Sequence, residues 1–303
     1  MRGQALIAGR GRLPAAVAAE MDRPLICSLR GNDPDGLEPE ITFRLEHLGT
    51  LLQTLSARGV TEVCFCGAVR RPEVDLAAID AATLPLVPIL QRALQPGDDA
   101  ALRAIIAVFE EAGLTVRAAH DIAPGLLPPT GTLSQAPADD AVRADIAAAR
   151  EALAEMARID EGQACVIRDG LVLAREDARG TDAMLTDLAA PGSRPVPPAD
   201  DPFNWLMDSV GDVLDDAADW LSGEEAERAR LKGARGLLYK APKPGQDRRA
   251  DLPTIGPGTV HGAARAGLRG IALEAGGVIV LERAEVIRLC DRAGLFLTVR
   301  EMP

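Results

Sequence analysis

A loop rich in charged residues lies between positions 240 and 258 of the chain and reads KAPKPGQDRRADLPTIGPG. Its lysines and arginines suit a phosphate, and its aspartates suit a metal ion or a water molecule. Because proline fixes φ and glycine tolerates positive φ, a segment so rich in both is expected to be rigid and specifically bent. The residue types therefore predict a ligand site, with a solvated connection as the alternative reading.

A second candidate lies near the N-terminus, where Gly9-x-Gly11 and Leu13-Pro14 follow an apolar run at 5–8. A buried strand, a glycine turn and a helix start are typical of the opening of a Rossmann-like unit, in which backbone N–H groups receive an anion. The third glycine of the dinucleotide fingerprint is missing. We therefore interpret the segment as a small strand-to-helix turn that touches a ligand.

A third candidate, Gly67 to Pro72, follows an apolar run at 60–65 that predicts a buried strand. Open parallel sheets bind ligands beyond the carboxyl ends of their strands. Arg70 and Arg71 are therefore candidates for a phosphate contact, and a solvated turn is the alternative.

The elements that position these residues alternate between strand and helix patterns. Leucines at 48, 51, 52 and 55 predict an amphipathic helix that stops at Gly59. The segment 124–137 reads PGLLPPTGTLSQAP and predicts a domain boundary. We expect two α/β domains at 1–134 and 138–303, the first Rossmann-like and the second carrying the catalytic loop, with the substrate bound between them.

The second predicted domain begins with a helix that ends near Arg158, followed by two strands joined through the turn Arg168-Asp169-Gly170. A further helix starts at Gly180-Thr181-Asp182, with Thr181 or Asp182 expected as the N-cap. An insertion near 200–224 contains apolar residues at helical spacing from 203 to 221, interspersed with aspartates. It predicts an acidic amphipathic helix with a packing or partner surface.

Composition excludes some classes of function. The 303 residues carry a net charge of −12, which argues against nucleic-acid binding because neutralising phosphates needs an excess of Lys and Arg. No apolar run is long enough for a signal peptide or a membrane span. The five cysteines lack paired metal-ligand spacing and indicate a reduced cytosol. Cys64 and Cys66 fall on one face of a predicted strand, where small buried hydrophobes are expected.

Taken together, the motifs resemble those of the LpxI family of UDP-2,3-diacylglucosamine pyrophosphatases, in order along nearly the whole chain. They are LIAGxGxLP at 6–14, GxVxRP at 67–72, GDD at 97–99, GQ at 162–163, GTDAM at 180–184, KAPKPxQ at 240–246, DLPTIG at 251–256 and EAG at 274–276. A glutamate commonly precedes Gly-Thr-Asp in that family, whereas this chain has Arg179, with Glu176 nearby.

The resemblance implies cytosolic hydrolysis of UDP-2,3-diacylglucosamine to 2,3-diacylglucosamine 1-phosphate (lipid X) and UMP, a step of lipid A synthesis in Gram-negative bacteria. It also implies a divalent cation, Mg²⁺ or another such as Mn²⁺, and a catalytic aspartate, Asp251 in this chain. A nucleotide-linked glycolipid substrate further suggests transient, peripheral contact with the cytoplasmic face of the inner membrane. A homodimer is a further possibility for this chain.

Cleaving a pyrophosphate needs cations, a metal ion and an oriented water. We assign these roles to residues of the motifs above. Asp251 is expected to bind the metal or to orient the water, with Asp182 and Asp247 as secondary metal ligands. The expected substrate-binding residues are Gly9, Gly11, Leu13, Arg71, Thr181, Lys240, Lys243, Gln246, Arg249 and Thr254.

Two other functions fit parts of the sequence. The Gly9-x-Gly11 turn also suits a nucleotide-sugar or dinucleotide-dependent oxidoreductase, although no clear ribose-binding acid follows the second predicted strand. A non-catalytic lipid or nucleotide binding protein would use the acidic helix near Trp220 as a docking surface. Release of UMP from UDP-2,3-diacylglucosamine separates the hydrolase from both.

Overall fold

The structure is a computed structural model that describes residues 3–70, 72–93, 98–139, 141–159, 161–189, 236–249 and 251–301. The predicted acidic helix at 203–221 lies outside the described residues. The chain forms two compact units, Met1–Gly125 with Gln246–Asp251, and Leu126–Gly245 with Leu252–Pro303. Both units combine helices with sheets, so the predicted α/β class with two domains is confirmed.

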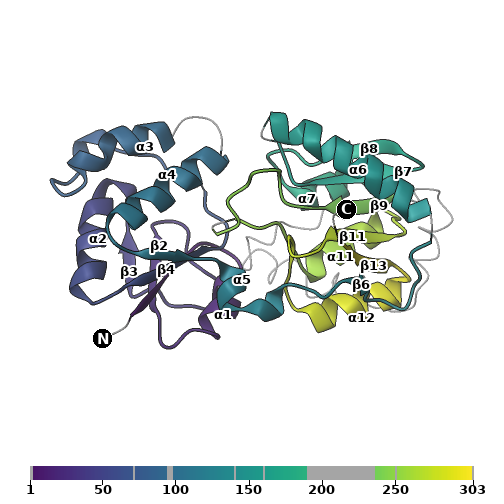
Figure 1. Ribbon diagram of the computed structural model, residues 1–303, viewed down its shortest axis with the longest axis horizontal. Helices are drawn as coiled ribbons and strands as arrows, with labels where there is room; N and C mark the ends of the chain where they lie inside the picture. Colours follow the sequence, from purple (N-terminus) through teal and green to yellow (C-terminus); the bar gives the residue numbers. More distant parts are fainter. Residues whose placement is uncertain are drawn as a thin grey trace, which may run out of the picture. The chain divides into compact units, whose positions relative to one another are not determined.

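The first unit, drawn in purple to blue in Figure 1, is built on a parallel five-stranded sheet. Its strand order is β3-β2-β1-β4-β5. Its strands are β1 (Gln4–Ala8), β2 (Leu25–Leu29), β3 (Ile41–Phe43), β4 (Glu62–Cys66) and β5 (Thr115–Arg117). The chain runs outward from β1 to β3 on one side and continues through β4 and β5 on the other. The reversal between β1 and β4 is a topological switch point, which confirms the Rossmann-like prediction.

Helices bury their apolar faces against this sheet. They are α1 (Leu13–Ala18), α2 (Leu48–Ala57), α3 (Val87–Ala93), α4 (Asp98–Glu111) and α5 (Ala119–Ile122), with 3-10 turns η1 (Leu45–His47), η2 (Leu76–Ala78), η3 (Leu84–Leu86) and η4 (Pro124–Leu126). Ala5 and Ile7 of β1 join one hydrophobic cluster with residues of α2, α3 and α4. The leucine spacing from 48 to 55 therefore predicted α2 correctly.

The second unit contains a mixed six-stranded sheet in the order β6-β13-β11-β9-β7-β8. Its strands are β6 (Gly131–Thr132), β7 (Ala164–Arg168), β8 (Leu171–Arg175), β9 (Leu237–Lys240), β11 (Gly270–Glu274) and β13 (Phe296–Arg300). Strands β9, β11 and β13 are parallel, and the predicted hairpin of β7 and β8 is confirmed. A separate parallel pair joins β10 (Thr254–Ile255) to β12 (Ile279–Val280).

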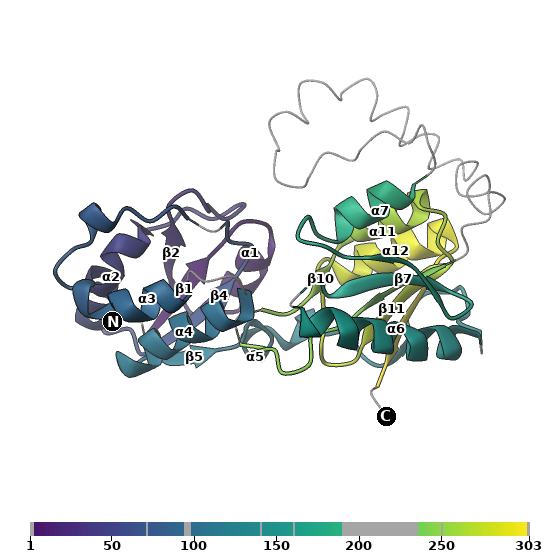
Figure 2. The same cartoon turned by 90° about the horizontal axis from the view of Figure 1, so that it is seen from above.

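Helices cover both faces of the second sheet, as Figure 2 shows. They are α6 (Ala141–Arg158), α7 (Thr181–Leu188), α11 (Pro257–Arg265) and α12 (Arg283–Ala293). Leu238, Ile271 and Leu297 belong to the cluster formed with α7, α11 and α12, whereas Tyr239 and Ala272 belong to the cluster formed with α6. Alternate residues of each strand thus face opposite layers.

The five cysteines are all free and buried, which confirms the prediction that Cys64 and Cys66 are packing residues. Burial raises the pKa of the Cys27, Cys165 and Cys290 thiols to about 12. The pKa of Cys66 is also raised, mainly by a hydrogen bond with Cys64 and to a smaller extent by burial. These thiols therefore stay protonated near neutral pH.

No helix in the described part of the chain is long and apolar enough to cross a membrane.

A buried acid, Glu46, fixes the loop that leads from β4 towards α3. Its Oε1 accepts hydrogen bonds from Arg44 Nη2 at 2.6 Å and from the Asp75 backbone N–H at 2.9 Å. The hydrogen bond from Arg44 is the main reason that the pKa of Glu46 falls to about 2. Because the folded-state pKa is depressed, the stabilisation is present above the ordinary value of 4.5 and is lost as the pH falls towards 2.

Replacing Glu46→Gln should therefore flatten the acid limb of the stability curve. We expect the free energy of unfolding to fall less steeply between pH 5 and 2.5 in the variant than in the wild type, as measured by urea denaturation with far-ultraviolet circular dichroism. Asp22→Asn, at a carboxylate that is 90% exposed, is the matched control and should retain the wild-type slope. Identical slopes for Glu46→Gln and the wild type would contradict this role.

Candidate functional site

The turns after β1 and β4 touch through their backbones, which explains the glycines at both positions. Gly9 N–H donates to Cys66 O at 2.8 Å, and Arg10 and Ala68 exchange hydrogen bonds at 2.8 and 3.0 Å. A Cβ on Gly9 would lie 2.6 Å from Ala68 O and 2.7 Å from Gly67 O. The two predicted ligand loops are therefore brought together at the switch point of the sheet.

Other predicted residues of the first unit surround these turns. Gly11 has a φ of 89°, and the half-buried Leu13 is the first residue of α1. Arg71 lies outside the described residues. Sequence reasoning missed Asn32, which is 2% exposed and accepts a hydrogen bond from Arg70 N–H at 2.6 Å through Oδ1. Its position directly after β2 was the available signal, because that loop reaches the same sheet edge.

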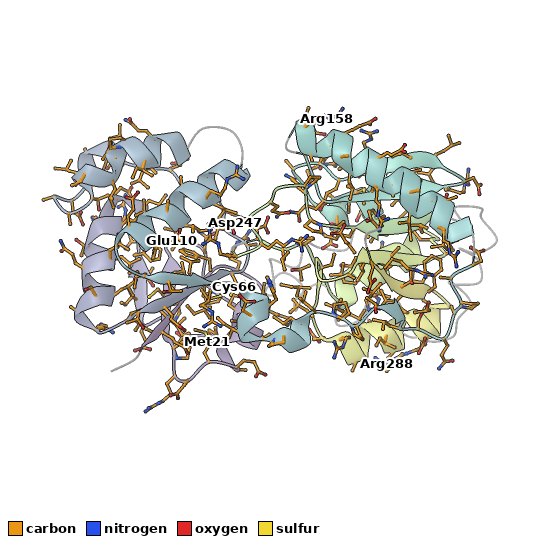
Figure 3. The ribbon with its side chains drawn as sticks, viewed as in Figure 1. Met21, Cys66, Glu110, Arg158, Asp247 and Arg288 are labelled. Atoms are coloured by element: carbon orange, nitrogen blue, oxygen red, sulfur yellow. The ribbon has the colours of Figure 1, made fainter. Side chains whose placement is uncertain are left out.

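The segment Gln246–Asp251 belongs to the first unit, although the chain on either side of it belongs to the second. Arg249 holds this segment on α4: Nη1 contacts Glu110 at 2.5 Å and Nη2 contacts Asp247 at 2.7 Å. Figure 3 labels Glu110 and Asp247, the two carboxylates that Arg249 joins. Arg249 is thus an anchor of the loop in this structure.

The same contacts change the acidity of Asp247. Hydrogen bonds from the Arg249 side chain are the largest cause that lowers the pKa of Asp247 below its ordinary value. Arg249 Nε also donates to Asp247 Oδ1 at 3.0 Å, so both oxygens of the carboxylate meet the guanidinium. A metal ion at Asp247 would have to compete with that guanidinium for the same oxygens.

Asp251 is exposed near the end of the same segment. Gln246 Nε2 donates to Asp251 Oδ2 at 2.7 Å and to its backbone oxygen at 3.1 Å. A neutral amide orients a carboxylate without removing its charge. Two of the predicted residues, Gln246 and Asp251, are therefore brought together by the loop.

In the second unit, Lys240, Thr181 and Glu176 form a buried cluster at the end of β9. Lys240 Nζ donates to Thr181 Oγ1 at 2.6 Å, and Thr181 Oγ1 donates to Glu176 Oε1 at 2.6 Å. Lys240 Nζ lies 3.8 Å from Glu176 Oε1. The structure thus joins two predicted residues to Glu176, which the sequence suggested only as a nearby acid.

The start of α7 corrects the predicted cap of this helix. Gly180, with a φ of 89°, occupies the N-cap position, and Thr181 is the first helical residue. The expectation that Thr181 or Asp182 would cap the helix is wrong, because the Thr181 hydroxyl is directed to Glu176 instead. Asp182 is exposed in the first turn, where the helix dipole favours a carboxylate.

The two remaining predicted residues lie in the second unit. Lys243 is half-buried in the loop after β9. Thr254 is half-buried in β10, and its hydroxyl donates to Leu252 O at 3.2 Å. Among the residues that the structure describes, no three acids, histidines or cysteines gather as a metal cluster. Asp251 and Asp247 belong to the first unit and Asp182 to the second.

Comparison with known proteins identifies the family. The profile described as the LpxI N-terminal domain matches residues 4–126, and that of the LpxI C-terminal domain matches 129–196 and 221–298. The chain belongs to the LpxI family. A relative from Caulobacter vibrioides, named UDP-2,3-diacylglucosamine pyrophosphatase LpxI, is 36% identical in an alignment that covers 98% of this chain and 97% of the relative. The LpxI C-terminal match includes the loop at 246–251, even though that segment contacts the first unit.

Substituting Gly9→Ala tests the close approach of the two turns. The added methyl would meet the backbone of Gly67 and Ala68, so we expect a loss of about 1–3 kcal/mol in stability and a lower thermal midpoint. Gly125→Ala is the control, because its Cβ would have nothing within 4 Å. Equal thermal midpoints for the two variants would contradict the argument.

Replacing Glu110→Gln tests the anchor made by Arg249. The pair is partly exposed, so we expect global stability to change by less than about 1 kcal/mol. Local opening of the loop should nevertheless increase, and trypsin should cleave after Arg248 or Arg249 about two to five times faster. Glu111→Gln, at the exposed neighbouring position, is the control. Unchanged cleavage in Glu110→Gln would show that the contact does not hold the loop.

Proposed function

We propose that this LpxI-family chain hydrolyses the pyrophosphate bond of UDP-2,3-diacylglucosamine to give 2,3-diacylglucosamine 1-phosphate and UMP. The observation that carries the proposal is the 36% identity to a UDP-2,3-diacylglucosamine pyrophosphatase across nearly all of both chains. The turns after β1 and β4 are the kind of loop that binds nucleotides in Rossmann-like sheets. The buried Lys240 ammonium is suited to a phosphate.

The diphosphate needs cations, because two neighbouring phosphates concentrate negative charge. In the proposal, Lys240 and Lys243 contact the diphosphate, and the substrate-binding residues Gly9, Gly11, Leu13 and Arg71 contact the nucleotide. Thr254 supplies a hydrogen bond. Arg249 serves chiefly as the anchor of the loop, since contact with a phosphate would require exchanging Glu110 for the ligand.

Asp251 is proposed as the residue that activates water. The water oxygen bonds to the β-phosphorus as its proton passes to the Asp251 carboxylate, and the bond from the β-phosphorus to the bridging oxygen breaks. UMP leaves with that oxygen, and the sugar phosphate retains the oxygen of the water. Gln246 holds the Asp251 carboxylate in place for this step.

A divalent cation is also part of the proposal, with Mg²⁺ favoured and Mn²⁺ as an alternative. Mg²⁺ usually takes one or two protein carboxylates together with substrate phosphates and waters, so a cluster of three protein ligands is not required. Asp251 and Asp182 are each candidate ligands, whereas Asp247 fits less well because both of its oxygens meet Arg249. When bound, the cation would neutralise charge on the diphosphate.

The lipid part of the proposed substrate has consequences for location. A diacylated sugar nucleotide resides at a membrane surface, so we propose that the chain acts at the cytoplasmic face of the inner membrane through transient contact. A homodimer is compatible with this proposal.

The decisive assay incubates the purified full chain with UDP-2,3-diacylglucosamine and Mg²⁺ and measures UMP. We expect release of UMP by the wild type and a loss of about 10²–10⁴-fold in turnover for Asp251→Asn, because a positioned general base contributes that much. The variant should still bind substrate. Asp22→Asn, at an exposed carboxylate, is the control and should keep its rate.

Three outcomes would contradict parts of this proposal. Absence of UMP with the wild type would remove the hydrolase function. A near-normal rate in Asp251→Asn would remove Asp251 from the chemistry. In water labelled with heavy oxygen, label found in UMP would place the attack on the α-phosphorus instead.

A further inference from the structure

A directional chain of hydrogen bonds begins at the Lys240 ammonium, which has N–H donors and no acceptor. Lys240 must therefore donate to Thr181 Oγ1, and the Thr181 hydroxyl in turn donates to Glu176 Oε1. Glu176 Oε2 accepts a further hydrogen bond from the Gln163 backbone N–H at 2.6 Å. Both oxygens of the carboxylate are thus used, and the orientation of the Thr181 hydroxyl is fixed.

The backbone around Glu176 is held firmly. Its N–H donates to Ala164 O in β7 at 2.9 Å, and a Cβ on Gly162 would collide with the Glu176 backbone. The acid therefore sits on the frame of the sheet at the end of β8. A carboxylate fixed in this way can transmit its position to the groups that donate to it.

Burial makes the cluster depend on charge balance. The side chains of Lys240 and Glu176 are only 8% and 9% exposed, and an unpaired buried charge is strongly unfavourable. The two charges are nevertheless separated by 3.8 Å, with the Thr181 hydroxyl bonded to both. Within the described part of the chain, the Lys240 ammonium makes one hydrogen bond and this longer ion pair, and an ammonium has three donors.

We propose that Glu176 is a positioning residue that, through Thr181, directs the Lys240 ammonium towards the diphosphate of the substrate. Thr181 is then a relay between the two charges, and its hydroxyl is not itself a substrate ligand. The inference rests on the proposed function, because it assigns the remaining donors of Lys240 to a diphosphate.

Stability alone is a weak explanation for the cluster. Buried ion pairs often contribute no more to stability than well-packed apolar residues of similar volume. A purely structural Glu176 would affect folding and leave the UDP affinity of the folded protein unchanged. The affinity for UDP therefore distinguishes the two roles.

The central variant is Glu176→Gln, with Glu155→Gln as the matched control at an exposed ion pair of the same unit. A carboxamide accepts through one oxygen only, so its NH₂ group conflicts with either the Gln163 N–H or the Thr181 hydroxyl. We expect the Kd for UDP, measured by titration calorimetry, to rise about tenfold or more in Glu176→Gln, and by less than about twofold in Glu155→Gln.

A double-mutant cycle shows whether Glu176 acts through Lys240. Lys240→Met removes the cation, so adding Glu176→Gln to it should raise the Kd for UDP by less than about twofold more. Additive losses would overturn the inference, because Glu176 would then act independently of Lys240. The same cycle on kcat and KM with the glycolipid substrate should give the same non-additivity.

Thr181 supplies a second route to the answer if Glu176→Gln does not fold. Thr181→Val keeps the shape and removes the hydroxyl, so it should raise the Kd for UDP about tenfold. Thr181→Ser keeps the hydroxyl and should stay within about threefold of the wild type. Equal UDP affinity in folded Thr181→Val and the wild type would overturn the inference.

Failure of the inference and failure of the proposed function have different signatures. A wild type that binds UDP but releases no UMP from the glycolipid would contradict the hydrolase, and the UDP titrations would still decide the role of Glu176. A wild type that releases UMP, with Glu176→Gln folded and unchanged in Kd and kcat, would overturn the inference alone. A wild type that does not bind UDP would also overturn it.

Discussion

Parallel strand pairing is the constraint on which both units depend. Strands that run in the same direction deliver their following loops to the same sheet edge, so residues far apart in the sequence become neighbours there. In the first unit this edge joins the turn after β1 to the turn after β4. In the second unit Lys240 stands at the end of β9, beside β11.

The two sheets use this constraint differently. In the first unit two turns pack backbone against backbone, because there is no room for a side chain at Gly9 or Gly67. The second unit uses a buried side chain, Lys240. Its ammonium donates a hydrogen bond to Thr181, which in turn donates to Glu176. A buried cation of this kind can stabilise the charge of a diphosphate.

Much of the fold could be predicted from hydrophobic periodicity and turn residues. The spacing of leucines located α2, and the Arg168-Asp169-Gly170 turn located the β7–β8 hairpin, because both signals are local. The short strands β3 and β6 carried no distinct pattern, since three and two residues are too few for an alternation to be recognised.

The candidate site was less predictable, because its contacts depend on side chains brought together by the sheet. The sequence suggested Thr181 and Lys240, but the contact of Thr181 with Glu176 is evident only once β8 and β9 are placed on either side of β7. At Arg249, residue type left two roles open. A cation near a predicted phosphate site could equally pair with acids, and in the structure it holds Asp247 and Glu110.

The membership of Gln246–Asp251 in the first unit has a consequence for dissecting the protein. The first unit is discontinuous in sequence, so a fragment truncated after Gly125 would lack a segment that is part of its own fold. Such a fragment would leave Glu110 without Arg249 and would omit Asp251. To express the first unit alone, the six residues 246–251 would have to be added back to the fragment, for example as a C-terminal extension. A single cut in the natural sequence therefore cannot separate the two units intact.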